Sequence, residues 1–227
     1  MKAIILAAGK GIRMRPLTLA TPKPLLEING KLIIDYVLDS LPPEVDEVII
    51  VINYLGSQIK KYIDQKNLKR KVHYVQGSSK GTAYSFLAAK KYLDNERFLL
   101  LYGDEIPNPV DVEHCLSKNL SMLVFETTTP ESHGIAYIKS NGMIERIVEK
   151  PKNPTSRIAV DGIMVLNTDI FNYEPQQTSG EFYFSTLAGL FVRDHKVTPV
   201  HAQNFIGDLT APKDIERVKR IINMSLL

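Results

Sequence analysis

The 227-residue chain lacks several features that would assign it to a familiar class. Its single cysteine, Cys115, cannot form an internal disulfide, and the lack of a second thiol argues against a cysteine-based metal site. No apolar run reaches the length of a membrane span, and the chain enters an apolar strand at once, without the hydrophobic stretch of a signal peptide. We therefore expect a soluble cytoplasmic protein that does not bind membranes.

Strong charge is also missing. The formal net charge is +3, and no concentrated basic stripe predicts nucleic-acid binding. The densest basic run, residues 69–71, lies between a predicted helix and a predicted strand, and we expect it to be a solvated turn. The mild positive charge suits an anionic small molecule as the partner.

A linker is missing as well, because no stretch rich in proline, glycine or serine divides the chain. With 44% hydrophobic residues, a chain of this length can bury one sizeable core. We expect a single domain over residues 1–227 whose pattern changes near residue 120. No segment resembles a hexapeptide repeat, so no C-terminal β-helix is expected.

What is present in the first half is an alternation of strand and helix patterns. Strands buried on both faces are predicted at 2–8, 46–53, 71–75 and 97–102, and helices at 31–41, 55–66 and 80–93. This order predicts a parallel sheet covered by helices, with ligands at the carboxyl ends of the strands. Gly9 and Gly103 both follow such ends, so the loops that they begin should be neighbours.

The second half consists of shorter, strand-rich segments. Strands are predicted at 121–127, 134–139, 143–149, 160–166 and 196–201, and helices at 181–193 and 212–224. Residues 140–142, Ser-Asn-Gly, predict a hairpin turn between two of these strands.

The most informative segment follows the first strand, where residues 9–18 are GKGIRMRPLT and residues 21–25 are TPKPL. Glycines followed by basic side chains let backbone N–H groups close on a polyanion, and Lys23, between two prolines, adds a fixed charge. Two familiar phosphate loops are excluded. Met14 stands where the dinucleotide fingerprint needs glycine, and Gly11 stands where the Walker loop needs serine or threonine.

This segment resembles the signature loop of the sugar-1-phosphate nucleotidyltransferases, and further matching segments follow in order to about Lys219. The resemblance implies a Rossmann-like α/β fold of three α/β/α layers, with a mixed, mostly parallel central sheet and a β-rich acceptor subregion. It implies that residues 1–120 bind the nucleotide and residues 121–227 the sugar phosphate. The implied nucleotide-binding residues are Leu6, Ala8, Gly9, Gly11, Arg13, Gln76, Gly81 and Asp104.

Two acidic residues predict a metal site. Asp104 follows the strand predicted at 97–102, at a place where an aspartate after a glycine can also be a turn residue. Asp208 opens a segment similar to the family's Asp-Ile-Gly-Thr-Pro-Glu-Asp, with Thr210 in place of the glycine. Two distant carboxylates can share one Mg²⁺, which leaves room for waters and phosphates. The resemblance implies that Asp104 and Asp208 hold Mg²⁺, and we expect Asp214 to cap the final helix.

Base selection is predicted in residues 74–83, YVQGSSKGTA. The amide of Gln76 carries an acceptor and donors and can read a pyrimidine edge, and Gly81, at a helix start, can let a base approach the backbone. The spacing Gln-x4-Gly-Thr-Ala resembles the uridylyl- and thymidylyltransferases, whereas guanylyl-transferring relatives more often have glutamate. The sequence favours UTP or dTTP without choosing between them.

The sugar-phosphate site is implied by three segments. Gly134 lies in a segment similar to the family's Tyr-Gly-Val, and Glu149 and Lys150 offer a carboxylate to sugar hydroxyls and an ammonium to the phosphate. An isolated Glu-Lys pair is usually a solvated surface pair. However, Val160 and Gly162 stand at the family's spacing from this pair and would line the same pocket.

The implied reaction needs no general base, because a sugar-1-phosphate oxygen is already anionic. Its attack on the α-phosphorus of a nucleotide requires two polyanions held in line with their repulsion neutralised. Arg13, Lys23 and Asp104 are the predicted catalytic residues. Arg13 would hold the leaving pyrophosphate, Lys23 would bridge the sugar phosphate and the α-phosphate, and Asp104 would hold the metal.

Two departures from the family bear on the substrates. Ile12 stands where many relatives have threonine, and Glu105 where the thymidylyl branch often has asparagine. The alternatives are a cytidylyl- or guanylyltransferase acting on another phosphorylated acceptor, such as mannose-1-phosphate, and a catalytically silent homologue that binds nucleotide sugars. Retention of Arg13, Lys23, Asp104 and Asp208 together argues against the silent homologue. Relatives often form dimers or tetramers, so a homo-oligomer is also expected.

Overall fold

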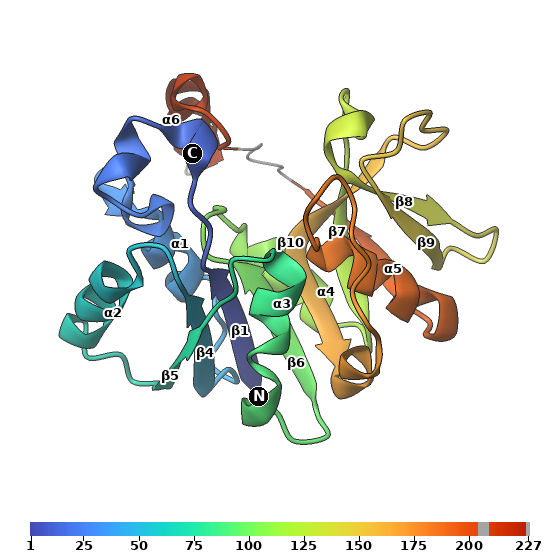
Figure 1. Ribbon diagram of the computed structural model, residues 1–227, viewed down its shortest axis with the longest axis horizontal. Helices are drawn as coiled ribbons and strands as arrows, with labels where there is room; N and C mark the ends of the chain where they lie inside the picture. The colour runs from blue at the N-terminus through green and yellow to red at the C-terminus, as the bar shows by residue number, and fades with distance from the viewer. Residues whose placement is uncertain (204–208, 226–227) are drawn as a thin grey trace.

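The structure, a computed structural model, describes residues 1–203 and 209–225 (Figure 1). Its strands are β1 (Lys2–Ala7), β2 (Glu27–Ile28), β3 (Lys31–Leu32), β4 (Glu47–Ile52), β5 (Lys71–Gln76), β6 (Arg97–Tyr102), β7 (Ser121–Glu126), β8 (Gly134–Ile138), β9 (Ile144–Glu149), β10 (Ile158–Asn167) and β11 (Thr198–His201). Its α-helices are α1 (Ile33–Asp39), α2 (Gly56–Gln65), α3 (Thr82–Leu87), α4 (Pro109–Leu116), α5 (Phe184–Asp194) and α6 (Ile215–Ser225). Single 3-10 turns lie at Ile12–Met14, Leu17–Leu19, Lys23–Leu25, Lys90–Tyr92, Pro130–Ser132, Thr168–Asn172 and Pro212–Asp214.

One mixed sheet runs through both halves of the chain in the order β11-β7-β10-β6-β1-β4-β5. β1 pairs in parallel with β4 and β6, β4 with β5, and β11 with β7. β10 is antiparallel to both β6 and β7, so among these strands it alone runs against the others. The hairpin of β8 and β9 joins the sheet through β10. The prediction of a mixed, mostly parallel sheet is confirmed.

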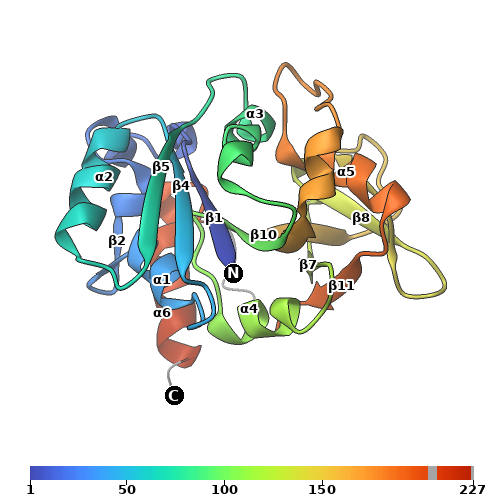
Figure 2. The ribbon, with the colours of Figure 1, turned by 90° about the horizontal axis from the view of Figure 1, so that it is seen from below.

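Helices cover both faces of the sheet because the side chains of each strand alternate between the faces. On β1, Ile4 and Leu6 belong to the core that packs against α3 and α5, whereas Ala3, Ile5 and Ala7 belong to the core under α1, α2 and α4. Figure 2 shows α3 and α5 on one side of the sheet and α1 and α4 on the other. The expected three α/β/α layers are therefore present.

All predicted strands are found, but the pattern misjudged two neighbouring segments. β5 was expected to be buried on both faces, and it is the edge strand of the sheet, with Lys71 and Gln76 exposed. The helix expected over 80–93 is divided into α3 and the 3-10 turn Lys90–Tyr92. The expectation of a fully buried strand fails because no further strand pairs with β5 among the described residues.

The basic run at 69–71 is not simply a solvated turn. Arg70 is half-buried, and its guanidinium donates to the carbonyl oxygens of Leu41, Pro42 and Val45. These carbonyls follow α1, where helix-end C=O groups need donors. Arg70 therefore fixes the turn between α1 and β4, a role that the local sequence does not reveal.

Helix α4 was not predicted, although its start carries a standard signal. The side chain of Asn108 accepts a hydrogen bond of 3.0 Å from the N–H of Val110, and Pro109 occupies the first helical position. Cys115 on this helix is fully buried, and burial raises the pKa of its thiol to about 12.

The last helix, α6, packs against the loop that follows β1. Met14 is 1% exposed and belongs to one apolar cluster with Val218 and Ile222 of α6 and with Leu209. The N-terminal loop and the end of the chain are thus held by the same small core. Over residues 1–203 and 209–225, no helix is both long enough and apolar enough to span a membrane.

Candidate active site

The loop after β1 is folded tightly on itself. Gly11 has a left-handed backbone with φ of +57°, and a Cβ there would lie 3.0 Å from the methyl group of Thr18 and 3.4 Å from Cβ of Lys23. The buried Thr18 hydroxyl donates to the carbonyl oxygen of Gly11 at 2.7 Å. In contrast, Gly9 is exposed, with nothing within 4 Å of the position of a Cβ. The tight turn at Gly11 brings the loop against Lys23.

Lys23 lies beside Asp104, as expected of loops at neighbouring strand ends. The N–H of Gly103 donates to the carbonyl oxygen of Leu6 at 2.9 Å, and this bond aligns the exits of β1 and β6. The Lys23 side chain is 10% exposed, and its Nζ lies 2.8 Å from Oδ2 of Asp104. An ammonium buried to this degree is stabilised by its paired carboxylate.

Arg13 extends from the same loop into solvent. It is exposed, and the structure gives it no hydrogen bond or ion pair to any described residue, so its guanidinium can accept an anion. Lys10 and Arg15 are exposed as well. Met14, next to Arg13, is the buried anchor that holds this part of the loop on α6.

The predicted base-reading loop begins at the exit of β5. Gln76 is exposed, and its Nε2 donates to Oδ1 of Asn53 at 2.9 Å. A Cβ on Gly77 would lie 2.7 Å from Cβ of Ala8, so the loops after β1 and β5 are in contact. Leu6 places its side chain in the core, and its carbonyl oxygen accepts from the N–H of Gly103, so its contact with a nucleotide stays a prediction.

Gly81 has a different neighbour from the one that the sequence suggested. Its φ is +137°, and a Cβ there would lie 2.4 Å from the carbonyl oxygen of Phe182. Its lack of a side chain is therefore required by a protein contact. The approach of a base to Gly81 stays a prediction.

Three of the predicted sugar-phosphate residues, Gly134, Glu149 and Lys150, meet at the paired ends of β8 and β9. Gly134 pairs with Glu149 across the two strands, and a Cβ on Gly134 would lie 3.2 Å from Oε2 of Glu149. The Glu149 side chain is 8% exposed and accepts a 2.6 Å hydrogen bond from Oγ of Ser185. Lys150 Nζ donates to the Tyr183 hydroxyl at 2.7 Å. Glu149 and Lys150 are therefore organised residues and not a freely solvated pair.

The backbone at Lys150 is unusual. Its φ is +45°, a left-handed conformation that costs a non-glycine residue roughly 1–2 kcal/mol. Its N–H donates to the carbonyl oxygen of His133 at 2.9 Å. Such conformations cluster at functional sites, where the surrounding structure enforces them.

Gly162 lies under two side chains that come from the exit of β6. A Cβ on Gly162 would lie 2.8 Å from Cγ of Tyr102 and would collide with the Glu105 carboxylate. Glu105 is hydrogen-bonded to Asp161, and burial together with the Asp161 charge raises the pKa of Glu105 well above its ordinary value. Val160 is half-buried and packs on the core.

Tyr102 lies near carboxylates from both halves of the chain. Burial raises the pKa of its phenol well above the ordinary value, and the negative charges of nearby carboxylates add to the effect; these are Glu105, Glu149, Asp104 and Asp161. Asp104 and Glu149, which were predicted from distant segments, therefore both act on the same phenol.

The predicted metal pair of Asp104 and Asp208 stays a prediction, because the described residues do not include both. Asp208 lies outside them, and over residues 1–203 and 209–225 no three His, Cys, Asp or Glu side chains form a metal site. Asp104 does fit, because its side chain is 37% exposed and Mg²⁺ commonly binds one or two carboxylates together with substrate phosphates. Asp214 caps the segment as expected, since its Oδ2 accepts from the N–H groups of Thr210 and Ala211.

The sequence did not single out Asn53, Tyr183 and Ser185. Asn53 follows a buried strand and could have been suspected from that position alone. Tyr183 contacts Lys150 from 33 residues further along the chain, and Ser185 contacts Glu149 from 36 residues further along. Their local sequence gives no sign of these contacts.

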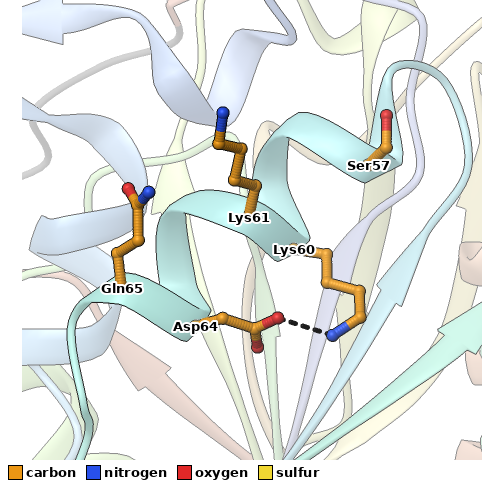
Figure 3. Close-up of a pocket in the computed structure, with 5 residues that line it drawn as sticks. All are labelled: Ser57, Lys60, Lys61, Asp64 and Gln65. Atoms are coloured by element: carbon orange, nitrogen blue, oxygen red, sulfur yellow. Dashed lines mark hydrogen bonds and ion pairs between the residues drawn. The ribbon is translucent and has the colours of Figure 1, made fainter.

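A surface hollow on α2 lies apart from these residues (Figure 3). Ser57, Lys60, Lys61, Asp64 and Gln65 line it, and Lys60 forms a 2.6 Å ion pair with Asp64. Because every lining residue comes from one helix, polar groups do not converge there from several elements as they do at the strand ends.

Comparison with known proteins agrees with the fold. Over 218 residues the chain is 33% identical to the bifunctional protein GlmU of Methanocaldococcus jannaschii. The aligned region covers 95% of this chain and 52% of that protein. It is 27% identical over 234 residues to UTP--glucose-1-phosphate uridylyltransferase AglF of Haloferax volcanii, covering 97% and 96%. The chain spans about half the length of the GlmU relatives.

A solved structure shares the fold. The crystal structure of a candidate glucose-1-phosphate thymidylyltransferase from Bacillus anthracis, in complex with sucrose, superimposes with a TM-score of 0.79. It has 23% sequence identity and covers 97% of this chain and 94% of that one. The family model described as "Nucleotidyl transferase" matches residues 2–198, and the chain therefore belongs to the nucleotidyl transferase family.

Proposed function

We propose that this protein transfers a nucleotidyl group from UTP or dTTP to a sugar-1-phosphate, with release of pyrophosphate. The observation that carries the proposal is the contact of Lys23 with Asp104 at the exits of β1 and β6, with Glu149 near the same tyrosine as Asp104. Cations for phosphates and a carboxylate for sugar hydroxyls are thereby gathered at one edge of the sheet, where ligands of such folds bind.

The reaction forms one bond and breaks one. An anionic phosphate oxygen of the sugar-1-phosphate bonds to the α-phosphorus, and the bond from that phosphorus to the oxygen bridging to the β-phosphate breaks. The electron pair leaves with pyrophosphate, and no proton has to move. The protein therefore contributes positioning and charge neutralisation.

The basic residues divide this work by their positions. Arg13 is exposed and unpaired among the described residues, and its planar guanidinium can bind the leaving pyrophosphate through two hydrogen bonds. Lys23 is held in place by burial and by its pairing with Asp104, so it can serve both reacting phosphates without moving far. Lys150 lies on the sugar side, where Tyr183 orients its ammonium.

Asp104 would hold a divalent ion, proposed to be Mg²⁺, and Asp208 is the proposed second ligand. When bound, such an ion neutralises phosphate charge. Without a ligand, the ammonium of Lys23 balances the negative charge of Asp104.

Gln76 is the proposed reader of the base. Its bond to Asn53 uses one amide N–H, which leaves the carbonyl oxygen and the second N–H for a pyrimidine edge. AglF, which aligns over almost its whole length, is named for UTP, and this supports a uridine nucleotide. The sugar is proposed to be glucose-1-phosphate or a related hexose or hexosamine phosphate.

The test is pyrophosphate release in Mg²⁺ from a panel of nucleotides and sugar-1-phosphates. UTP, dTTP, CTP and GTP are each combined with glucose-, N-acetylglucosamine- and mannose-1-phosphate. We expect turnover with UTP or dTTP and a loss of about 100-fold or more in Asp104→Asn. Asp39→Asn, which removes the exposed ion pair with Lys31, is the matched control. Activity with GTP or CTP only would refute the base assignment, and no release with any pair would favour the silent homologue.

The remaining expectations stay predictions. They are a cytoplasmic location, self-association, the division into a nucleotide half (1–120) and a sugar-phosphate half (121–227), and the absence of nucleic-acid and membrane partners.

A further inference from the structure

Residues 182–185, at the start of α5, lie between the two halves of the candidate site. We call them the connector. The N–H of Phe182 donates to the carbonyl oxygen of Lys80 at 3.2 Å, and the N–H of Ala83 donates to the carbonyl oxygen of Phe182 at 2.9 Å. The backbone of the connector is therefore bonded to the loop proposed to read the base.

Thr82 and Gly81 complete this contact. The hydroxyl oxygen of Thr82 accepts a 2.8 Å hydrogen bond from the N–H of Phe184. At Gly81 the Phe182 backbone approaches so closely that a Cβ would lie 2.4 Å from its carbonyl oxygen and 2.8 Å from its nitrogen. The rings of Tyr84 and Phe182 also meet edge to face at 5.0 Å. Phe182 and Phe184 of the connector thus rest on the base loop.

The intervening residues of the connector contact the sugar side. The Tyr183 hydroxyl accepts from Lys150 at 2.7 Å, and the Ser185 hydroxyl donates to Glu149 at 2.6 Å. Lys150 also lies over the Tyr183 ring, 4.1 Å from its centre. Residues 182 and 184 therefore bind the base loop, and residues 183 and 185 orient the two proposed sugar-phosphate ligands.

We propose that Thr82 is a positioning residue that couples the two substrates: its hydroxyl holds the connector on the base loop, so that a nucleotide bound at this loop strengthens sugar-phosphate binding at Glu149 and Lys150. The inference rests on the proposed function. A nucleotide that restricts the base loop also restricts the connector, so the second ligand has less ordering to impose. Linkage requires the sugar phosphate to strengthen nucleotide binding by the same factor.

The test measures binding without turnover. With a chelator present, the dissociation constant of glucose-1-phosphate is determined by calorimetry with and without saturating UTP. In the wild type we expect UTP to tighten binding by about fivefold or more, which is within the usual range of such coupling. In Thr82→Val, which keeps the side-chain shape and removes the acceptor, the ratio should fall to within about twofold of one. Thr82→Ser, which keeps the hydroxyl, should restore it.

Two control variants each remove a hydroxyl bond outside both segments. Ser117→Ala loses the bond to the His114 carbonyl oxygen at the end of α4, and Ser40→Ala loses the bond to the Val37 carbonyl oxygen at the end of α1. Both should keep the wild-type ratio, because neither bond joins the connector to the base loop.

A wild-type ratio of one would overturn the proposal, whatever the variants do, and so would an unchanged ratio in Thr82→Val. Pyrophosphate release by the wild type distinguishes a failure of the proposed coupling from a failure of the proposed function. Release without coupling would leave the proposed function standing and remove the role of Thr82. If the wild type neither binds these ligands nor releases pyrophosphate, both proposals fail.

Discussion

At the scale of single residues, we predict that the loop after β1 needs the planar guanidinium of Arg13 and not only its charge to bind phosphate. Arg13→Lys keeps the charge but removes the planar fork, so turnover should fall by about 2 kcal/mol of transition-state stabilisation, roughly 30-fold. Steady-state pyrophosphate release at saturating Mg²⁺ measures this effect.

Arg15→Lys is the matched control, because Arg15 is another exposed arginine of the same loop. Its turnover should stay near that of the wild type. Ile12→Thr should be neutral or mildly activating, since Ile12 is 60% exposed and the change only supplies a hydroxyl. Equal turnover of Arg13→Lys and the wild type would mean that backbone N–H groups alone hold the phosphates.

Gln76 provides a second residue-scale prediction. Gln76→Glu removes the N–H groups of the amide and places a carboxylate against the base edge and against Asn53. UTP and dTTP should lose about 2–3 kcal/mol of binding, while GTP loses less. Competition of each nucleotide in the pyrophosphate assay gives the ranking. Gln58→Glu serves as the control, because it removes the hydrogen bond that the side-chain amide of Gln58 donates to the Ala20 carbonyl oxygen. An unchanged ranking in Gln76→Glu would assign base recognition to other groups.

Residue patterns predicted the charged groups of the site better than their immediate partners. The pairing of Lys23 with Asp104 could be expected because two neighbouring strand exits were recognised. The stacking of Glu105 and Tyr102 over Gly162 could not, because it depends on how closely β10 approaches β6. Side chains at strand ends are predictable from order along the chain, and packing distances are not.

At the scale of elements, Asp214 fixes the entry to α6. Its side chain is 16% exposed and accepts bonds of 3.0 and 2.8 Å from the N–H groups of Thr210 and Ala211. Burial alone would raise the pKa of Asp214, but these bonds outweigh burial and lower it. Asp214→Asn should reduce the free energy of unfolding by about 1–2 kcal/mol at pH 7.

The pH dependence of this effect follows from its sign. Because the folded-state pKa is lowered, the stabilisation is complete above the ordinary aspartate pKa of about 4 and is lost as the pH falls through the folded-state value. Urea unfolding of the wild type and Asp214→Asn at pH 7, and at steps below pH 4, should show the difference shrinking. Glu216→Gln, which removes an exposed pair with Lys219, should have little effect at either pH. A difference independent of pH would mean that the ionised carboxylate is not the stabilising group.

Elements with strong local signals were predictable. Strand periodicity located every strand of the large sheet, and the Ser-Asn-Gly turn located the hairpin of β8 and β9, where Gly142 has a φ of +81°. The connector was not predictable, because residues 80–84 and 182–184 are far apart in the sequence and are joined largely by bonds to backbone groups. Neither segment has a sequence pattern that indicates contact with the other.

At the scale of the whole molecule, the two halves share one sheet. β6 of the first half pairs with β10 of the second, and one apolar core contains residues of β1 and of α5. We expect a single cooperative transition in urea, with coincident curves from far-ultraviolet circular dichroism and tyrosine fluorescence. Separate transitions would show that residues 1–120 and 121–227 are independent domains.

The buried thiol has a practical consequence for watching the protein work. Cys115 is fully buried and its thiol has a pKa of about 12, so near neutral pH the native chain presents almost no thiolate to a maleimide. A cysteine introduced at Ser179, in the turn before the connector, would then be the preferred attachment point for a dye, without first removing Cys115. Because Cys115 would take up little dye, the fluorescence of the labelled protein would report motion of this loop during a single catalytic cycle.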